Sequence, residues 1–425
     1  MSLISSLYIG QNGLETSSLE LGVIGDNIAN AGTIGFKSGR ASFADLVGES
    51  LVGGAGEFGL GTRLVAVQQI LTQGSLATTG ISTDLAISGP GLFVVRAPDG
   101  TVAYTRNGQF TLDANGFVVD LQGNRVQGFP ADATGTVSGV LGDLQPGQAT
   151  APPRATTSVT VRANLDSEAV VPALPFDSSD PNATSNFSAT TQVFDSLGKA
   201  HDVTTYFNKT ADGAWEWHSL TDGAGVEGGV AGVDVEINAG TLTFDTNGRL
   251  LDATETVDNF FPLGATSPQE LSFDFGSSIA SGGTGEGISQ FAQTSAASFL
   301  GQDGFAAGDL AAISVDPNGN VTGTFTNGQI RVLGQVGLAD FPAADQLQRA
   351  GGNLLTQTVR SGEPNVGAPG TGGRGALFSG TLEQSNVDVA TELVRMIVVQ
   401  RGFQANSKTV STADALLAEL IQIKR

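Results

Sequence analysis

Residues 386–425 read NVDVATELVRMIVVQRGFQANSKTVSTADALLAELIQIKR and close a chain whose preceding part alternates in the manner of strands and turns. Apolar residues recur in this stretch at alternating steps of four and three, the period of a helix with one apolar stripe. Of ten positions stepped from Val389, seven are apolar: Val389, Leu393, Met396, Phe403, Val410, Leu417 and Ile421. The spacing predicts a long amphipathic helix at the end of the chain.

Both ends of this helix carry sequence signals. Ser385 lies three residues before Asp388, the spacing of a capping box at a helix start. Lys424 and Arg425 lie at the negative end of the helix dipole, where cations are favourable. We therefore predict a helical segment over residues 385–425.

The first 30 residues follow the same period. Of eight positions stepped from Leu3, six are apolar: Leu3, Leu7, Leu14, Leu21, Ile24 and Ile28. Gly32 is the predicted stop. Two such helices would be roughly 40 to 55 Å long, which is more than one small domain covers. We expect them to form a coiled-coil domain of residues 1–30 and 385–425; helices that only cover the core of their own domain are the alternative.

Composition restricts the partners of the chain. It has 425 residues and a formal net charge of −22, which argues against nucleic acid and anionic membrane surfaces as partners. No stretch has the ~18 to 20 apolar residues of a membrane-spanning helix. The chain has no cysteine, so disulfides and thiolate chemistry are excluded. The opening MSLISSLYIGQNGLE has no Lys or Arg, so we expect no cleaved signal peptide.

The interior is predicted to be β structure. Residues 84–129 alternate apolar and polar positions between Asn-Gly and Asp-Gly turns, which is typical of antiparallel hairpins. The fold class is therefore mostly β with α-helical termini, and nested discontinuous β domains stand on the helix pair. The predicted divisions are an extended, partly flexible connector of 31–75 and 376–384, an inner β domain of 76–148 and 307–375, and an inserted outer β domain of 149–306.

The sequence gives only weak evidence for a catalytic or metal-binding site. The turn Asp-x-Asn-Gly occurs at 113–116, 245–248 and 316–319, but none completes a calcium loop, so hairpin turns are the better interpretation. His201 and His218 are the two histidines, and no nucleophile elbow accompanies them. A glycosidase carboxylate pair stays open in a chain with 42 acidic residues, although nothing singles out a pair. We predict no catalytic residue, metal site or cofactor, and so no enzyme.

Three segments resemble the flagellar axial proteins of the rod and hook, and most closely the hook protein. They are LELGVIGDNIANAGTIGFKSGRASFADL (19–46), YTRNGQFTLDANGFVVD (104–120) and the end from GTLEQSNVD (380–388) onward. The insert TTQVFDSLGKAHDVTTYFNKTADGAWEW (190–217) is similar to the outer domain of the hook protein. In the first segment the family turn motif comprises Asn27, Asn30, Gly35, Phe36 and Lys37.

The resemblance implies a structural role. Copies would assemble helically into a curved tube, a flexible joint that transmits torque from rod to filament and encloses the export channel. The implied partners are copies of itself, the rod, hook-cap and hook-filament junction proteins, and the flagellar type III export apparatus, with an extracellular location. A distal-rod or other axial subunit is the first alternative, and a secreted glycan-active β protein or adhesin is the second.

Overall fold

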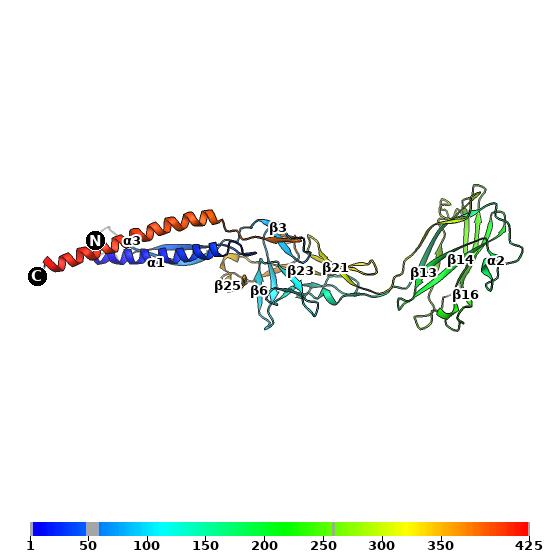
Figure 1. The fold of residues 1–425 in the computed structure, drawn as a ribbon, viewed down its shortest axis with the longest axis horizontal. Coiled ribbons are helices and arrows are strands. Elements are labelled where there is room, and N and C mark those ends of the chain that lie inside the picture. Colours follow the sequence, from blue (N-terminus) through cyan, green and yellow to red (C-terminus); the bar gives the residue numbers. More distant parts are fainter. Residues whose placement is uncertain (1–2, 48–58, 257–259, 424–425) are drawn as a thin grey trace. The chain divides into compact units, whose positions relative to one another are not determined.

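The computed structural model describes residues 3–47, 59–256 and 260–423, with a long helix at each end and strands between (Figure 1). Unit 1 comprises Met1–Ala149, Ala311–Thr324 and Ile330–Arg425, and unit 2 comprises Thr150–Leu310 and Phe325–Gln329. Unit 2 is inserted into a discontinuous unit 1, and the prediction of a mostly β fold with helical termini is confirmed. None of the described helices is long and apolar enough to cross a bilayer.

The terminal helices of unit 1 lie side by side (Figure 1). α1 spans Leu3–Ala29 and α3 spans Val389–Ile423. The carboxylate of Asp388 caps α3, because it accepts hydrogen bonds from the backbone N–H groups of Ala390 at 2.9 Å and Thr391 at 3.2 Å. The predicted capping box was wrong: the Ser385 hydroxyl lies before the first turn and accepts from the Val387 N–H at 3.3 Å instead.

The end of α1 also differs from the prediction. The helix stops at Ala29, and the Asn30 N–H donates to the Asp26 carbonyl oxygen at 3.1 Å. Gly32 does not adopt the positive φ of a glycine stop, whereas Gly35 does, with φ 69°. The chain therefore leaves the helix through a six-residue turn region rather than a single glycine cap.

The predicted connector contains a hairpin instead. β1 (Gly39–Val47) and β2 (Gly59–Gln69) pair antiparallel, and both pack on α1. Its return segment likewise forms β28 (Ala376–Ser379) and β29 (Thr381–Glu383). The sequence prediction missed these strands because the Gly-rich run near residue 55 suggested an extended chain; residues 48–58 lie outside the described part.

Most of the remaining strands of unit 1 form one antiparallel sheet, in which the strand order does not follow the sequence order. Its central order is β22-β23-β9-β5-β6-β26-β25. These strands are β5 (Leu92–Arg96), β6 (Val102–Thr105), β9 (Arg125–Pro130), β22 (Asn320–Phe325), β23 (Ile330–Val336), β25 (Gln348–Gly351) and β26 (Leu354–Thr356). Shorter strands are β3 (Leu76–Thr78), β4 (Leu85–Ser88), β7 (Phe110–Leu112), β8 (Val118–Asp120), β10 (Gly142–Asp143), β24 (Leu338–Asp340) and β27 (Asn365–Gly367). β28 pairs with β4 and β29 with β3, so segments from both ends of the sequence close this unit.

The three Asp-x-Asn-Gly segments are hairpin turns, as predicted. Gly116, Gly248 and Gly319 all have positive φ, which glycine adopts without strain. At the first turn, the Asp113 carboxylate accepts from the Asn115 and Phe117 N–H groups at 2.9 and 2.8 Å. Each aspartate oxygen thus supports its own turn.

Unit 2 is built from two sheets that share one core. The sheet order of the larger is β13-β14-β15-β16-β17, and β12 is the centre of the smaller, pairing with β18, β19 and β20. The bounds are β12 (Ser158–Asp166), β13 (Phe187–Phe194), β14 (Ala200–Ala211), β15 (Ala214–Asp222), β16 (Asp234–Phe244), β17 (Leu250–Thr256), β18 (Ser272–Asp274), β19 (Ser289–Phe291) and β20 (Ala296–Gln302). β11 (Thr150–Ala151), α2 (Pro181–Thr184) and β21 (Gly308–Val315) complete the chain, with short 3-10 turns at Pro146–Gln148, Gly223–Gly225 and Ala344–Gln346. Alternate residues of β12 pack with the buried Trp215 and Trp217 of β15, as in a β-sandwich.

We expect the buried pair of Asp195 and His201 to make unit 2 sensitive to acid. Burial raises the pKa of the Asp195 carboxyl, but hydrogen bonds from His201 (3.0 Å) and from two backbone N–H groups outweigh it and lower the pKa below its ordinary value. Stability from such a group is present above the ordinary aspartate pKa and is lost as pH falls through the lowered one. Both tryptophans of the chain lie in unit 2, so we expect their fluorescence to report a lower denaturant midpoint at pH 3 than at pH 5.

Asp195→Asn should weaken this pH dependence and lower the free energy of unfolding at pH 7 by about 1–3 kcal/mol. Asp202→Asn, at an exposed position on β14, is the matched control and should behave like wild type. Equal acid sensitivity of the two variants would contradict this prediction.

Candidate assembly site

The two terminal helices approach closely at a pair of glycines in α1. A Cβ added to Gly10 would lie 2.6 Å from Cγ2 of Val410, and one added to Gly13 would lie 2.5 Å from Nδ2 of Asn406. Real Cβ contacts are essentially never this short, so a Cβ at either position would require the facing side chain of α3 to move. Residue numbers rise along α1 as they fall along α3, so the pair is antiparallel.

The least exposed face of α3 differs in phase from the predicted stripe. Met396, Val410 and Leu417 lie on it as predicted, partly buried. The other members of this face are Glu392, Val399, Asn406 and Ala413. Each lies one residue before a position of the predicted stripe. Leu393 is therefore turned away from α1 and is 46% exposed.

The predicted stripe of α1 faces inward more consistently. Ile24 is 3% exposed, and Leu7, Leu14, Leu21 and Ile28 are partly buried. Leu3 and Ile421 belong to the helices, but their side chains lie outside the described part. Whether all these residues serve polymerisation stays a prediction.

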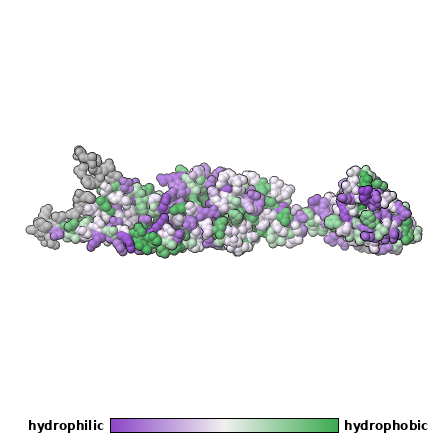
Figure 2. All heavy atoms as spheres, turned by 90° about the horizontal axis from the view of Figure 1, so that it is seen from above, coloured by the Kyte–Doolittle hydropathy of each residue, from purple (hydrophilic) through white to green (hydrophobic). Residues whose placement is uncertain are grey.

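Five apolar residues on the first turns of α3 are uncovered within the chain. This outer apolar patch consists of Val389, Leu393, Val394, Ile397 and Val398, each 40% to 63% exposed. Phe403, further along, is 39% exposed. Figure 2 shows apolar surface on the helical part of unit 1. Clustered exposed apolar residues mark interaction sites on soluble proteins.

A buried ion cluster ties the start of the chain to its end in unit 1. This junction cluster consists of Lys37, Arg106 and Glu383. Lys37 Nζ lies 2.6 Å from Glu383 Oε1, and Arg106 Nη1 lies 3.2 Å from Glu383 Oε2. The side chains are 5%, 6% and 0% exposed, in the order given above. Burial lowers the pKa of Lys37, and the hydrogen bond and charge of Glu383 oppose that shift.

The glutamate also fixes the backbone around it. Its Oε1 accepts from the Gly74 N–H at 2.8 Å, and its backbone carbonyl accepts from the Gly35 N–H at 2.8 Å. Lys37 donates in addition to the Thr72 carbonyl oxygen at 2.7 Å. Both flanks of the β1–β2 hairpin are thereby joined to β29.

The family turn motif lies at this junction. The Asn27 side chain, 1% exposed, exchanges two hydrogen bonds with the backbone of Gly39, at 2.8 and 2.9 Å. Gly35 packs so closely that a Cβ there would lie 2.5 Å from the Asn107 nitrogen. Phe36 is buried, and the Arg349 guanidinium lies 5.0 Å from its ring centroid.

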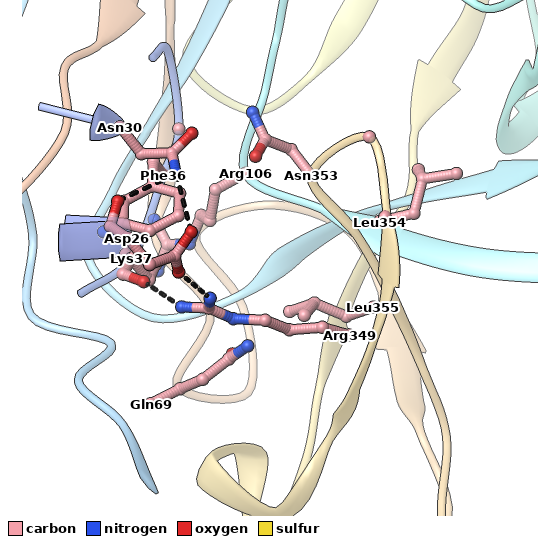
Figure 3. Close-up of a pocket in the computed structure, with 13 residues that line it drawn as sticks. Asp26, Asn30, Phe36, Lys37, Gln69, Arg106, Arg349, Asn353, Leu354 and Leu355 are labelled. Atoms are coloured by element: carbon pink, nitrogen blue, oxygen red, sulfur yellow. Dashed lines mark hydrogen bonds and ion pairs between the residues drawn. The ribbon is translucent and has the colours of Figure 1, made fainter. Parts of the chain in front are cut away.

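Polar side chains extend the junction on both sides. Arg349 forms an ion pair with Asp26 at 2.8 Å and donates to the Lys37 carbonyl oxygen at 2.7 Å (Figure 3). Asn30 donates to the Asp26 carbonyl oxygen at 2.9 Å, and its own side-chain oxygen accepts from Thr33. The motif residues therefore set the path from α1 into the hairpin.

Sequence reasoning missed Arg106, Arg349, Glu383 and Asn386. Arg106, Glu383 and Asn386 fall inside the segments that carry the family resemblance, which was the one available signal. Asn386 accepts from the Ser38 N–H at 2.8 Å and donates to the Ile70 carbonyl oxygen at 2.7 Å. These partners are far apart in sequence, so no local pattern marks them.

The histidines support structure in unit 2. His201 pairs with Asp195, and His218 Nδ1 lies 2.7 Å from Glu236 Oε1 while its ring stacks on Phe176. Within residues 3–47, 59–256 and 260–423, no group of three His, Asp or Glu residues is placed to hold a metal ion.

Comparisons with known proteins cover most of the chain. Residues 7–37 match a family model described as flagella basal body rod protein, and 86–164 match the flagellar hook protein FlgE/F/G D1 domain. Residues 164–305 match the flagellar basal body protein FlaE D2 domain, and 379–423 match the flagellar basal body rod FlgEFG protein C-terminal. The first and last matches include Lys37 and Glu383, respectively.

Full-length relatives decide the family. The flagellar hook protein FlgE of Escherichia coli strain K12 is 36% identical over 97% of this chain and 98% of its own. The chain belongs to the flagellar hook protein family. FlgE of Treponema pallidum is 32% identical over the whole of both chains, and FlgE of Brucella abortus is 34% identical over the same extent. This hook protein is a structural subunit of the flagellar hook, as the resemblance implied.

The helix contact of the hook protein is open to a direct test. Gly10→Val places a side chain where Val410 already lies, so it should force α1 away from Val410. Overpacking of this kind costs about 1–3 kcal/mol of folding free energy. We expect faster hydrogen exchange in both terminal helices, measured by mass spectrometry. Gly22→Val is the matched control, because a Cβ there meets nothing within 4 Å. Equal exchange in the two variants would show that the helices do not depend on this contact.

Proposed function

We propose that copies of this hook protein polymerise helically through α1 and α3 into a flexible, curved tube. The tube encloses the export channel and transmits torque from the rod to the filament. The outer apolar patch is the observation that carries the proposal, since five apolar side chains of one helix remain 40% to 63% exposed in the single chain. Neighbouring copies would supply that cover, and helices of this kind gain most of their stability from packing.

The polymerisation residues we propose come from both helices. They are Leu3, Leu7, Leu14, Leu21, Ile24, Ile28, Val389, Leu393, Met396, Phe403, Val410, Leu417 and Ile421. Residues buried against the partner helix would hold the pair together, and the exposed residues would contact other copies. The junction cluster would keep the helix pair attached to the β part of unit 1 during bending.

We further propose a division of labour along the chain. The helical domain, 1–30 and 385–425, forms the inner layer; 76–148 and 307–375 form an inner β domain; and 149–306 forms the outer one. The stretches 31–75 and 376–384 link these layers as a hairpin and two short strands. Polar, Gly-rich β surfaces suit the weak contacts that must change as the tube bends.

The proposed partners follow from this role. They are other copies of the chain, the rod, the hook-cap and hook-filament junction proteins, and the flagellar type III export apparatus. The subunit acts outside the cell, exported without a cleaved signal peptide, and has neither catalytic activity nor a nucleic-acid partner.

The deciding experiment compares the full chain with a chain that ends at Asp388. The truncated chain keeps Lys37, Glu383 and Asn386, so the junction stays intact while α3 is removed. Both are placed in polymerising salt and followed by sedimentation and negative-stain electron microscopy. We expect curved tubes from the full chain and folded monomers from the truncated one.

The other outcomes separate the alternatives. Straight polymers of the full chain would favour a distal-rod subunit. Tubes formed equally well by the truncated chain would overturn the role of α3. Monomers in both samples, combined with cleavage of a saccharide, would favour the glycan-active alternative.

A further inference from the structure

A cavity of about 250 Å³ lies beside the junction cluster in unit 1 (Figure 3). Its walls come from the end of α1, the turn that follows, the end of β2, and the β25–β26 hairpin. Phe36 and Leu355 give it apolar surface, while Lys37, Gln69 and Arg106 give it polar surface. The cavity is large enough for a side chain to enter.

Two residues that line the cavity each have a buried polar atom without a hydrogen-bond partner among the residues that the structure describes. The atoms are Oε1 of Gln69 and Nε of Arg106, in residues 7% and 6% exposed. Arg106 is held in position, because its terminal nitrogens donate to Glu383 and, at 2.7 Å, to the Gly89 carbonyl oxygen. A buried polar group left unpaired destabilises the protein, so a ligand that pairs it binds more favourably.

The charges around the cavity are unbalanced. Lys37, Arg106 and Arg349 bring three positive charges, and Asp26 and Glu383 bring two negative charges. One positive charge is therefore left without a carboxylate in a largely buried setting. An added carboxylate removes this imbalance, which a neutral ligand does not.

We propose that this cavity receives an acidic side chain from a second copy of the chain. Nε of Arg106 and Oε1 of Gln69 are shielded from solvent in the single chain, so both side chains shift on binding. The carboxylate then accepts from Nε–H of Arg106 and from the Gln69 amide, whose oxygen and nitrogen exchange places when the amide turns over. A second copy is the partner that the charge favours, because the chain has 42 acidic against 20 basic residues. The end of α1 also lines the cavity, and α1 is one of the helices through which copies are proposed to assemble. The inference rests on the proposed function for the identity of the partner.

Gln69 allows a test that separates binding from folding. Its side chain has no hydrogen bond within the described chain, so Gln69→Leu should leave the melting temperature of the monomer unchanged or raise it. Gln69→Glu places a carboxylate in the cavity and should block the site from within. We expect each variant to raise the critical concentration for polymerisation about tenfold, the effect of losing one charged hydrogen bond. Gln357→Leu, at an exposed glutamine of unit 1, should polymerise like wild type.

A second measurement probes the monomer directly. In a chain labelled with ¹⁵N-arginine, acetate should shift the Nε–H signal of Arg106, assigned by its absence from Arg106→Lys. Wild-type critical concentrations for both Gln69 variants, or an unmoved Arg106 signal at saturating acetate, would overturn the inference. If wild type forms no polymer at all, the proposed function fails, and the acetate shift alone decides whether the cavity is a carboxylate site.

Discussion

The double variant Val394→Asp, Val398→Asp should form no tubes while both β units stay folded. Val394 and Val398 are 62% and 63% exposed in the single chain, so aspartate there disturbs no core. In a polymer the same positions would be covered. Each substitution then forfeits about 1.5–3 kcal/mol of apolar burial and in addition buries a charge.

The measurement is sedimentation of the polymer, with tryptophan fluorescence to check the fold of unit 2 and circular dichroism to check the strands. The control is Val140→Asp, Val359→Asp, which places the same two changes at exposed valines of unit 1 that lie on neither helix. We expect this control to polymerise. Normal tubes from the α3 variant would remove the outer apolar patch from the assembly surface.

Glu383→Gln should be the most destabilising conservative change in unit 1. Its carboxylate is fully buried and compensates both Lys37 and Arg106. Breaking a buried pair by removing one partner costs about 3–5 kcal/mol, because the remaining charge stays buried without compensation. The glutamine keeps the shape of the side chain and one acceptor oxygen. The loss of stability therefore measures the removal of the negative charge and not the creation of a cavity.

The pH dependence of this variant has a defined sign. Without Glu383, burial lowers the pKa of Lys37 further below its ordinary value. Between the lowered pKa of Lys37 in the folded chain and its ordinary pKa in the unfolded chain, the unfolded chain still holds the Lys37 proton that the folded chain has released. The free energy of unfolding of the variant therefore rises with pH over that range, and part of the deficit at neutral pH is recovered.

Hydrogen exchange of β4 and β28 measures this effect within unit 1, because these strands pair beside the cluster. Glu363→Gln, at an exposed glutamate of the same unit, is the matched control and should leave exchange unchanged. A Glu383 variant as stable as this control at neutral pH would mean that the cluster contributes no net stability.

The sequence alone predicted the elements that depend on local pattern. The apolar period predicted a helix at the end of the chain, and turn residues predicted the hairpins at 113–116, 245–248 and 316–319. A helix period and a positive-φ glycine are properties of neighbouring residues, so they can be read without the fold. The family resemblance likewise came from short contiguous segments.

The phase of α3 shows where local pattern stops being sufficient. Steps of four and three from Val389 include Leu393, whereas the structure turns Glu392, Val399 and Ala413 toward the inner face. Both stripes are apolar enough to satisfy the period, since α3 carries valine, leucine and isoleucine on more than one side. The close approach of Gly13 to Asn406 selects one stripe, because Asn406 belongs only to the observed face, and that contact exists only between helices.

The junction cluster was decided by tertiary structure alone. Lys37 and Glu383 are 346 residues apart, and nothing near either residue in sequence marks it as buried or paired. The sequence thus determined the terminal helices and the three Asp-x-Asn-Gly turns, because those depend on neighbours along the chain. The fold decided which charges leave water together, because desolvation and pairing depend on every element that packs around them.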